Sequence, residues 1–494
     1  MKKLSLLTAI ILLLQTGLHS QNVDDALRYS QIFYSGTARF NSMGGAFTAI
    51  GGDISTLSQN PAGLGFFRSS EFTITPHLMH NKTDALFHGN KSDFIYNFNL
   101  GQVGFVSNLL SNESGLVSFN FGYSFNKTNN LNQSVRIQGN NPTSSMTDFW
   151  ANSSYGTYFD DLENAQDLAY GTWLIDTLTG SGGIEYGTVY SNYGDNPPSR
   201  YGQNLRRIIS NEGFTAEHAI SFGGNYSNKI YFGATIGINT IDYTGHYEHM
   251  ESTTEDLPSD FRNFTYADHF ENKGTGYNIK FGAIIRPIEM VRIGLAFHSP
   301  TWYRIHEYFN QDIVSNFAGG DRYNAAIDPA RYDYGLTTPF RALAGAAVQV
   351  GKLAILSADY EFVDYSMAKF RNIGDDYNYN QVKNPEIRNS LKAVHNIRLG
   401  GELRFSKLYL RGGYGYYGKA FQADEDNSNL KYDVISAGLG FREKKVSIDF
   451  GFSNTRYDQT YFLYPLDATY EPAAALLSSN KNQFTLTLGY KFGY

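Results

Sequence analysis

Apolar and polar residues alternate with a period of two along much of the chain, most clearly over its last eleven residues. Successive side chains of a β-strand point to opposite faces, so this pattern predicts a strand with one apolar and one polar face. Such a strand is long enough to cross a bilayer at a tilt, as in a membrane barrel, and the last strand of a soluble sandwich is the alternative. The apolar face carries Phe484, Leu486, Leu488, Tyr490, Phe492 and Tyr494.

The same alternation recurs across the chain and defines fourteen candidate strands. Bacterial single-chain barrels have an even number of antiparallel strands, so the expected fold is all-β: a transmembrane antiparallel barrel of about fourteen strands. The candidate strands are 70–80, 92–109, 115–127, 214–228, 230–246, 273–287, 289–305, 335–350, 352–366, 393–406, 407–419, 431–443, 444–456 and 481–494.

The connections between these strands alternate between tight turns and long polar segments. Tight turns are expected near Asn228-Lys229 and Pro287-Ile288, whereas 128–213 is by far the longest segment. Short periplasmic turns and long external loops are typical of outer-membrane barrels, and an even strand count leaves both termini in the periplasm. Residues 128–213 could carry a short helix near Tyr158–Tyr170, and strands missed there would raise the count to sixteen.

The composition supports export to the outer membrane. Met1-Lys2-Lys3 followed by an apolar run to Leu14 predicts a signal peptide, residues 1–20, that is too short to span a bilayer. The chain has no cysteine, which excludes a lipid anchor and a disulfide framework, and its 37 Tyr and 36 Phe suit an aromatic girdle. A net charge of −7 argues against nucleic-acid binding.

Residues 21–69 do not alternate and are expected to plug the barrel, which residues 70–494 form. Asp53 can cap a short helix running to Gln59, which Pro61 prevents from continuing. A fourteen-stranded barrel is wider than its own side chains can fill, so an unplugged lumen would leak. A simple turn leading into the first strand is the alternative interpretation of this segment.

Three stretches in this segment resemble the N-terminal hatch of the FadL/TodX-type transporters of long-chain fatty acids and aromatic hydrocarbons. They are Thr37-Ala38-Arg39, Met43-Gly44-Gly45-Ala46 and the run from Asp53 to Leu64, about 30 residues in all. The resemblance implies a fourteen-stranded barrel, plugged by a hatch that rearranges to release hydrophobic substrates. Asn60, Pro61 and Ala62 map onto the hatch motif of that family. The external loops depart too far for any ligand-contacting residue to be carried over.

Two further sets of residues are candidates for the site. Charges at inward strand positions must face the lumen, since a Lys or Arg facing lipid would cost roughly 2–4 kcal/mol at the midplane. They can form a gating network or brace the barrel against its plug: Lys280, Arg292, Arg341, Asp359, Glu361, Arg398, Glu402, Arg404, Arg411 and Asp449. The expected apolar ligand contacts are Met43, Phe47, Leu57, Leu64, Phe66 and Phe67.

Enzymatic chemistry and cofactors are not expected. His77 and His80 point to opposite faces of a strand, so they do not predict a metal site, and no Gly-x-Ser-x-Gly motif marks a nucleophile. The expected function is passive uptake of hydrophobic small molecules through a hatch-gated outer-membrane channel. A non-transporting barrel that presents its long loops to secreted or other partner proteins is the alternative.

The expected surroundings follow from this location. Outer-membrane lipid and lipopolysaccharide would contact the barrel, and the C-terminal aromatic residue Tyr494 resembles the signal that the barrel-assembly machinery recognises during biogenesis.

Overall fold

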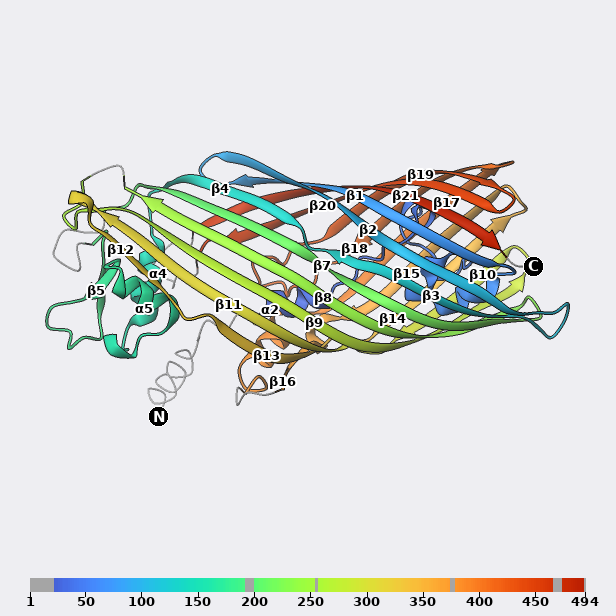
Figure 1. Cartoon of the computed structure of the whole chain (residues 1–494), viewed down its shortest axis with the longest axis horizontal. Helices are drawn as coiled ribbons and strands as arrows, with labels where there is room; N and C mark the ends of the chain where they lie inside the picture. Colours follow the sequence, from blue (N-terminus) through green and yellow to red (C-terminus); the bar gives the residue numbers. More distant parts are fainter. Residues whose placement is uncertain (1–21, 192–199, 254–255, 374–377, 465–472, 493–494) are drawn as a thin grey trace.

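The computed structural model describes residues 22–191, 200–253, 256–373, 378–464 and 473–492, which form a closed antiparallel β-barrel (Figure 1). The wall has fourteen strand positions, which confirms the number expected from the alternation. β1 (Ser70–Leu86) pairs with β2 (Asn90–Ser111) and with β21 (Ala474–Phe492), and the second pairing closes the barrel. The expected signal peptide and Tyr494 lie outside the described residues.

The other eleven wall positions follow one another in chain order, and four of them are built from two strands each. The two-strand positions are β3 (Leu116–Asn130) with β4 (Gln133–Asn141), β10 (Val291–His298) with β11 (Trp302–Phe317), β13 (Ala330–Thr337) with β14 (Arg341–Val350), and β15 (Ala354–Asp364) with β16 (Lys369–Asn372). The single strands are β7 (Gln203–Tyr226), β8 (Ile230–Ser252), β9 (Phe261–Ile288), β17 (Ala393–Phe405), β18 (Leu408–Tyr417), β19 (Tyr432–Glu443) and β20 (Val446–Phe462). A short strand, β12 (Arg322–Ala326), extends β11 as a hairpin.

Two neighbouring wall positions are interrupted, although the alternation predicted continuous strands over 289–305 and 335–350. β10 ends before Pro300 and β14 begins after Pro339. Proline has no N–H to donate to a sheet ladder, so each proline ends the pairing locally. Across the break, Thr301 and Thr338 hold the two positions together: the Thr338 N–H donates to the Thr301 carbonyl at 3.0 Å.

The outward face of the wall is apolar, and the inward face is polar. On β21, Leu486, Leu488 and Tyr490 are 40%, 46% and 49% exposed, whereas Thr485 and Thr487 are 1% and 2% exposed. This is the inside-out arrangement that a lipid environment selects, and it matches the faces expected from the sequence. No helix among the described residues is both long and apolar enough to cross a membrane.

Residues 22–69, here called the hatch, lie inside the barrel, where Figure 1 shows them in dark blue. They contain α2 (Val23–Ser30), α3 (Ala38–Ser42) and two 3-10 helices, η1 (Ile54–Ser58) and η2 (Pro61–Phe66). Asp53 caps η1 as expected, accepting a hydrogen bond from the Ser55 N–H at 3.0 Å.

The long connections gather at one end of the barrel, called the outer end here. The range 128–213 differs from the expected loop, because β4 and the start of β7 occupy its two ends. Residues 142–191 between them form a small folded unit, the cap. It contains α4 (Met146–Ser154), η3 (Phe159–Asp161), α5 (Asn164–Gly171), β5 (Ile175–Thr177) and β6 (Tyr186–Thr188), and α5 overlaps the helix expected near Tyr158–Tyr170. Other connections carry η5 (Ala318–Gly320), η6 (Tyr365–Met367) and α6 (Lys383–Ser390).

Candidate functional site

The hatch motif forms a buried turn between η1 and η2. The Asn60 side chain accepts a hydrogen bond from the Ala62 N–H at 3.1 Å and donates one to the Thr48 carbonyl at 2.6 Å. Pro61 begins η2, where a missing N–H costs nothing and the fixed φ suits the helix. The three residues expected from the motif therefore act together, since they cap one short helix and tie it to an earlier part of the hatch.

Glycines in the wall let this turn approach closely. A Cβ added at Gly282 on β9 would lie 1.9 Å from the Asn60 Oδ1 atom, and one added at Gly233 on β8 would lie 2.3 Å from the Pro61 carbonyl oxygen. Real side chains do not come this close. The wall is thus recessed at the motif because these positions carry no side chain.

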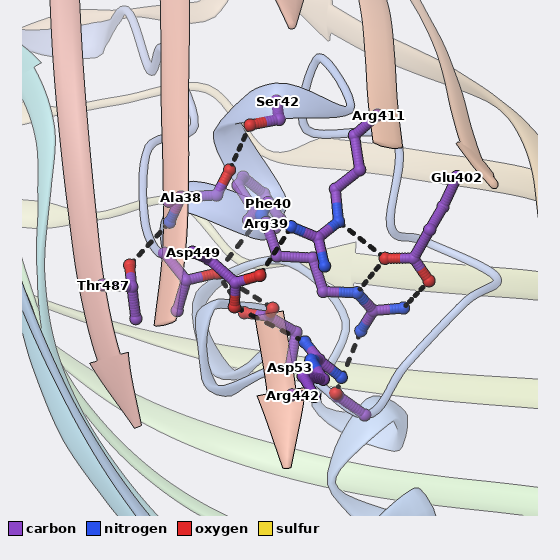
Figure 2. A network of polar contacts seen from close by, with 12 residues as sticks. Ala38, Arg39, Phe40, Ser42, Asp53, Glu402, Arg411, Arg442, Asp449 and Thr487 are labelled. Carbon is purple, nitrogen blue, oxygen red and sulfur yellow. Dashed lines mark hydrogen bonds and ion pairs between the residues drawn. The ribbon is translucent and has the colours of Figure 1, made fainter. Parts of the chain in front are cut away.

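A first network of charges joins the hatch to β17, β18 and β20 (Figure 2). Glu402 accepts hydrogen bonds from Arg39 of the hatch at 2.9 Å and from Arg411 of the wall at 2.7 Å. Arg411 also pairs with Asp449 at 2.6 Å. One wall carboxylate therefore holds a hatch arginine in place, and a second wall carboxylate balances the neighbouring arginine.

A second network lies further towards the outer end. Glu361 sits between Arg341 and Arg398, with N···O distances of 2.5 and 2.8 Å. Arg341 also donates to the carbonyl of Ser30 at the end of α2, and the Arg398 guanidinium lies 4.8 Å from the centre of the Tyr34 ring. All three charges are almost fully buried, so the pairing compensates the cost of removing them from water.

Three more lumen charges contact the hatch backbone. Lys280 pairs with Glu217 at 2.6 Å and donates to the Ser58 carbonyl at 2.7 Å. Asp359 accepts from the Thr48 N–H at 2.9 Å. Arg292, like Lys280, donates to a hatch carbonyl, that of Ile50 at 2.7 Å.

Arg404 differs from the other expected lumen charges. It is exposed near the end of β17, beside the tight turn, where it donates to the Ser406 carbonyl at 3.3 Å. The remaining expected charges contact the hatch or belong to an ion-pair network that does. Their arrangement is that of a brace between the wall and the hatch.

The six apolar residues that were expected to contact ligand pack between the hatch and the wall. Met43 and Phe47 cluster with Ala347 and Ile355 of the wall. Phe66 stacks on the Tyr231 ring at 3.9 Å. The other three are Leu57, Leu64 and Phe67, which cluster with Val106 and Ala219.

A chamber of about 460 Å³ lies on the outer side of the hatch. This volume is in the usual range for small-molecule sites. Phe33, Asn41 and Gly44 of the hatch form part of its lining, so a molecule in the chamber would touch the hatch directly. Tyrosines and amides from the wall complete much of the lining: Tyr243, Tyr247, Tyr432, Tyr457, Asn81, Asn99, Asn129, Asn130, Asn132, Gln133, Asn211 and Gln483.

Two lysines also line the chamber, which makes its surface amphipathic rather than purely apolar. The Lys481 Nζ atom donates to the Asn130 carbonyl at 2.9 Å, and the Lys127 Nζ atom lies 4.1 Å from the centre of the Phe214 ring. The residues that line the chamber were not predicted from the sequence. The asparagine-rich run 129–132 was visible, but inward positions all look alike in sequence, whether they face the hatch or a cavity.

Within the described ranges, no group of three or more His, Asp or Glu residues is placed to hold a metal ion. His77 is buried against the hatch, with its Nε2 atom 3.3 Å from the Gly36 carbonyl oxygen.

The architecture matches solved outer-membrane channels. The P. putida toluene transporter TodX aligns with a TM-score of 0.53 at 13% identity, over 94% of this chain and 100% of that one. A Pseudomonas aeruginosa FadL homologue aligns with a TM-score of 0.56 at 12% identity, again over 94% and 100%. No protein-family model and no curated protein sequence matches the chain.

At these identities the likeness establishes the fold. It confirms the resemblance to FadL/TodX-type barrels at the level of the fold, which is that of an outer-membrane β-barrel.

Proposed function

We propose that the protein is a passive outer-membrane channel for hydrophobic small molecules, either long-chain fatty acids or aromatic hydrocarbons, and that the hatch gates it. The observation that carries this proposal is the position of the chamber. It has the size of a ligand site and rests directly on the hatch, through Phe33, Asn41 and Gly44. A ligand that binds there contacts the part that must move before it can pass.

The hatch must rearrange for transport because it fills the lumen beneath the chamber. Its short helices are braced by polar contacts rather than by continuation of the wall sheet, so it can shift while the barrel stays closed. No covalent step and no cofactor is needed for such a passage. Export by a cleaved signal peptide, residues 1–20, belongs to the same proposal.

We propose that the ligand leaves sideways through the wall, at the break that interrupts the two neighbouring strand positions β10/β11 and β13/β14. The break at Pro300 and Pro339 lies next to the hatch, since His298 before it contacts the Gln59 carbonyl through Nε2 at 2.7 Å. An apolar groove on the outside of the wall begins nearby and includes Phe297 and Ala342. A ligand leaving here would pass into lipid rather than water, which suits a hydrophobic molecule.

A disulfide between hatch and wall tests the gate. The Ser58 Oγ atom of the hatch accepts from the Asn126 Nδ2 atom of β3 at 2.7 Å, and the chain has no native cysteine. In Ser58→Cys/Asn126→Cys, oxidation is expected to lower the uptake of a dansyl-labelled fatty acid or of toluene into proteoliposomes at least tenfold. Reduction should restore it.

The matched control is Thr83→Cys/Ser479→Cys, which links β1 to β21 within the wall, where the hydroxyl oxygens are 3.1 Å apart. Its uptake should not depend on oxidation. Equal uptake by the oxidised and reduced hatch variants would contradict a moving hatch. Mass spectrometry of molecules co-purified with the barrel would then identify the ligand, and a defined protein partner without any bound hydrophobe would favour the partner-binding alternative.

A further inference from the structure

The chain leaves the wall for the cap and returns from it at neighbouring points of the barrel rim. It follows Asn141, the last residue of β4, and the chain returns to the wall at Gln203, the first residue of β7. These two residues are directly paired with each other in the sheet. The cap can therefore turn as one body about this pair without breaking any pairing in the wall.

The contacts that hold the cap down are mostly apolar. Trp150 of α4 is fully buried, and its ring centre lies 5.5 Å from that of Phe264 and 5.6 Å from that of Tyr266, both on β9. Tyr190 packs on Phe261, also on β9, at 5.4 Å. Apolar contacts have no fixed direction, so such a face can separate and close again without a specific hydrogen-bond rearrangement.

Polar contacts also hold the closed position, among them a hydrogen bond from the Ser259 hydroxyl to the Val189 carbonyl at 2.7 Å. Beside the attachment point, Glu251 of β8 accepts from the Ser145 hydroxyl at 2.6 Å and from the Met146 N–H at 2.9 Å, at the start of α4. An acceptor with negative charge is favourable there because a helix N-terminus carries unpaired N–H groups. On the far side, the Ser315 hydroxyl of β11 donates to the Thr172 carbonyl of the cap at 2.7 Å.

The cap and the chamber share part of their walls. Val135, Ile209 and Leu477 belong to the apolar cluster that the cap completes, and the same three residues line the chamber. Figure 1 shows α4, α5 and β5 gathered at the outer end of the barrel. Lifting the cap would remove the cover from the outer side of these chamber residues.

We propose that the cap is a hinged lid: it turns about the Asn141–Gln203 pair and controls access from outside to the chamber. This proposal rests on the proposed function, because it assigns a second gate to the same ligand site. The hatch closes the inner side of the chamber and the lid closes the outer side, so that molecules reach the chamber only while the lid is raised.

The test ties the lid down on its far side. Trp173→Cys/Tyr323→Cys, joined by a short bismaleimide, would tie the cap to β12, because the two native side chains are exposed and their ring centres lie 6.4 Å apart. Lys407→Cys/Glu443→Cys, an exposed pair within the wall, is the control with the same reagent. The first readout is the binding rate of a dansyl-labelled fatty acid to the purified barrel, which should fall at least tenfold in the lid variant only.

The second readout needs no ligand. With Trp302→Phe added to the tied variant, Trp150 is the one tryptophan left of three. Cross-linking should lower the quenching of its fluorescence by acrylamide, since quenching needs the lid to open. Unchanged quenching and unchanged probe binding in the tied variant would overturn the lid. If quenching falls but no form of the protein, tied or free, binds a hydrophobic probe, the lid stands and the proposed function fails.

Discussion

At the scale of single residues, the hatch and the wall fit each other through missing side chains. Gly282 faces the Asn60 side chain so closely that a Cβ would lie 1.9 Å from the Asn60 Oδ1 atom. That oxygen is engaged in capping η2 through the Ala62 N–H. The N-terminal hydrogen bond of a short hatch helix therefore depends on a glycine that is more than two hundred residues away in sequence.

Gly282→Ala is expected to loosen the hatch. The added methyl group would push Asn60 away from the Ala62 N–H, at a cost of about 1–3 kcal/mol from overpacking and a weakened hydrogen bond. Hydrogen exchange of the amides in 46–64 should become faster while the barrel strands stay protected. Gly412→Ala is the control, since the nearest atom to its added Cβ lies 3.9 Å away; equal exchange in both variants would argue against the fit.

A second residue-scale prediction concerns Asp148 in the cap. Burial raises the pKa of this carboxyl to about 7, with a further contribution from Glu251, and hydrogen bonds from the Ser145 N–H and Tyr201 oppose the rise. The folded cap thus holds a proton that the unfolded chain releases near its usual pKa of 3.8. The resulting stability is fully present below that value and is lost as pH rises towards 7.

The docked cap should accordingly become less stable between pH 4 and pH 7, by at most ~4 kcal/mol. Hydrogen exchange of α4, corrected for the intrinsic pH dependence of exchange, measures this. Asp148→Asn removes the titrating group and should flatten the profile. A profile as steep as that of the native protein in this variant would assign the effect to another group.

At the scale of elements, α3 is fastened to the wall through charge. Arg39 on α3 meets Glu402 on β17, and Glu402 also holds Arg411 on β18. The shared carboxylate means that one side chain couples one hatch helix to two wall strands (Figure 2).

Glu402→Gln should release α3 because it leaves two arginines with a neutral partner. The expected loss is ~2–3 kcal/mol for the hatch, since breaking a buried pair leaves charge uncompensated. Single-channel conductance should become larger or noisier. Glu443→Gln is the control: its pair with Lys407 at 2.5 Å is exposed and contributes at most ~1 kcal/mol. Equal conductance in the two variants would show that Glu402 does not hold the hatch in place.

At the scale of the whole molecule, the two proline breaks lie beside each other in the closed wall. β10 pairs with β14 below them and β11 pairs with β13 above them, so one break in the regular pairing interrupts two neighbouring positions. The hatch contacts this break, since the His298 Nε2 atom lies 2.7 Å from the Gln59 carbonyl oxygen, so the proposed exit lies beside the proposed gate.

Pro300→Ala/Pro339→Ala restores two N–H donors and should let pairing continue through the break. Delivery of a fluorescent fatty acid into the lipid phase of proteoliposomes is then expected to fall several-fold, with little change in folding of the barrel. The measurement compares the lipid-phase signal with that of a water-soluble acceptor inside the liposome. A signal that is unchanged in lipid would favour exit through the lumen.

Much of the fold was predictable because lipid imposes a local rule. Each strand that crosses a membrane must alternate, so the wall strands, their even number and the turns could be assigned without knowing any contact between them. The N-terminal hydrogen bonds of η1 and η2 are also local, since Asp53 and Asn60 each accept one from an N–H two residues later. Breaks such as that at Pro300 were missed because apolar alternation continues on both sides of them.

The chain by itself determined the barrel, its number of strands and the alternation of an apolar outward and a polar inward face, because each of these follows from periodicity. Only the tertiary structure decided which charges meet, which residues line the chamber and where the cap sits. Arg39 and Glu402 are 363 positions apart, and their pairing depends on how the hatch lies within the closed wall. Leu57 and Phe47 are recognisably apolar in sequence, but only the closed wall shows that they pack between the hatch and the wall.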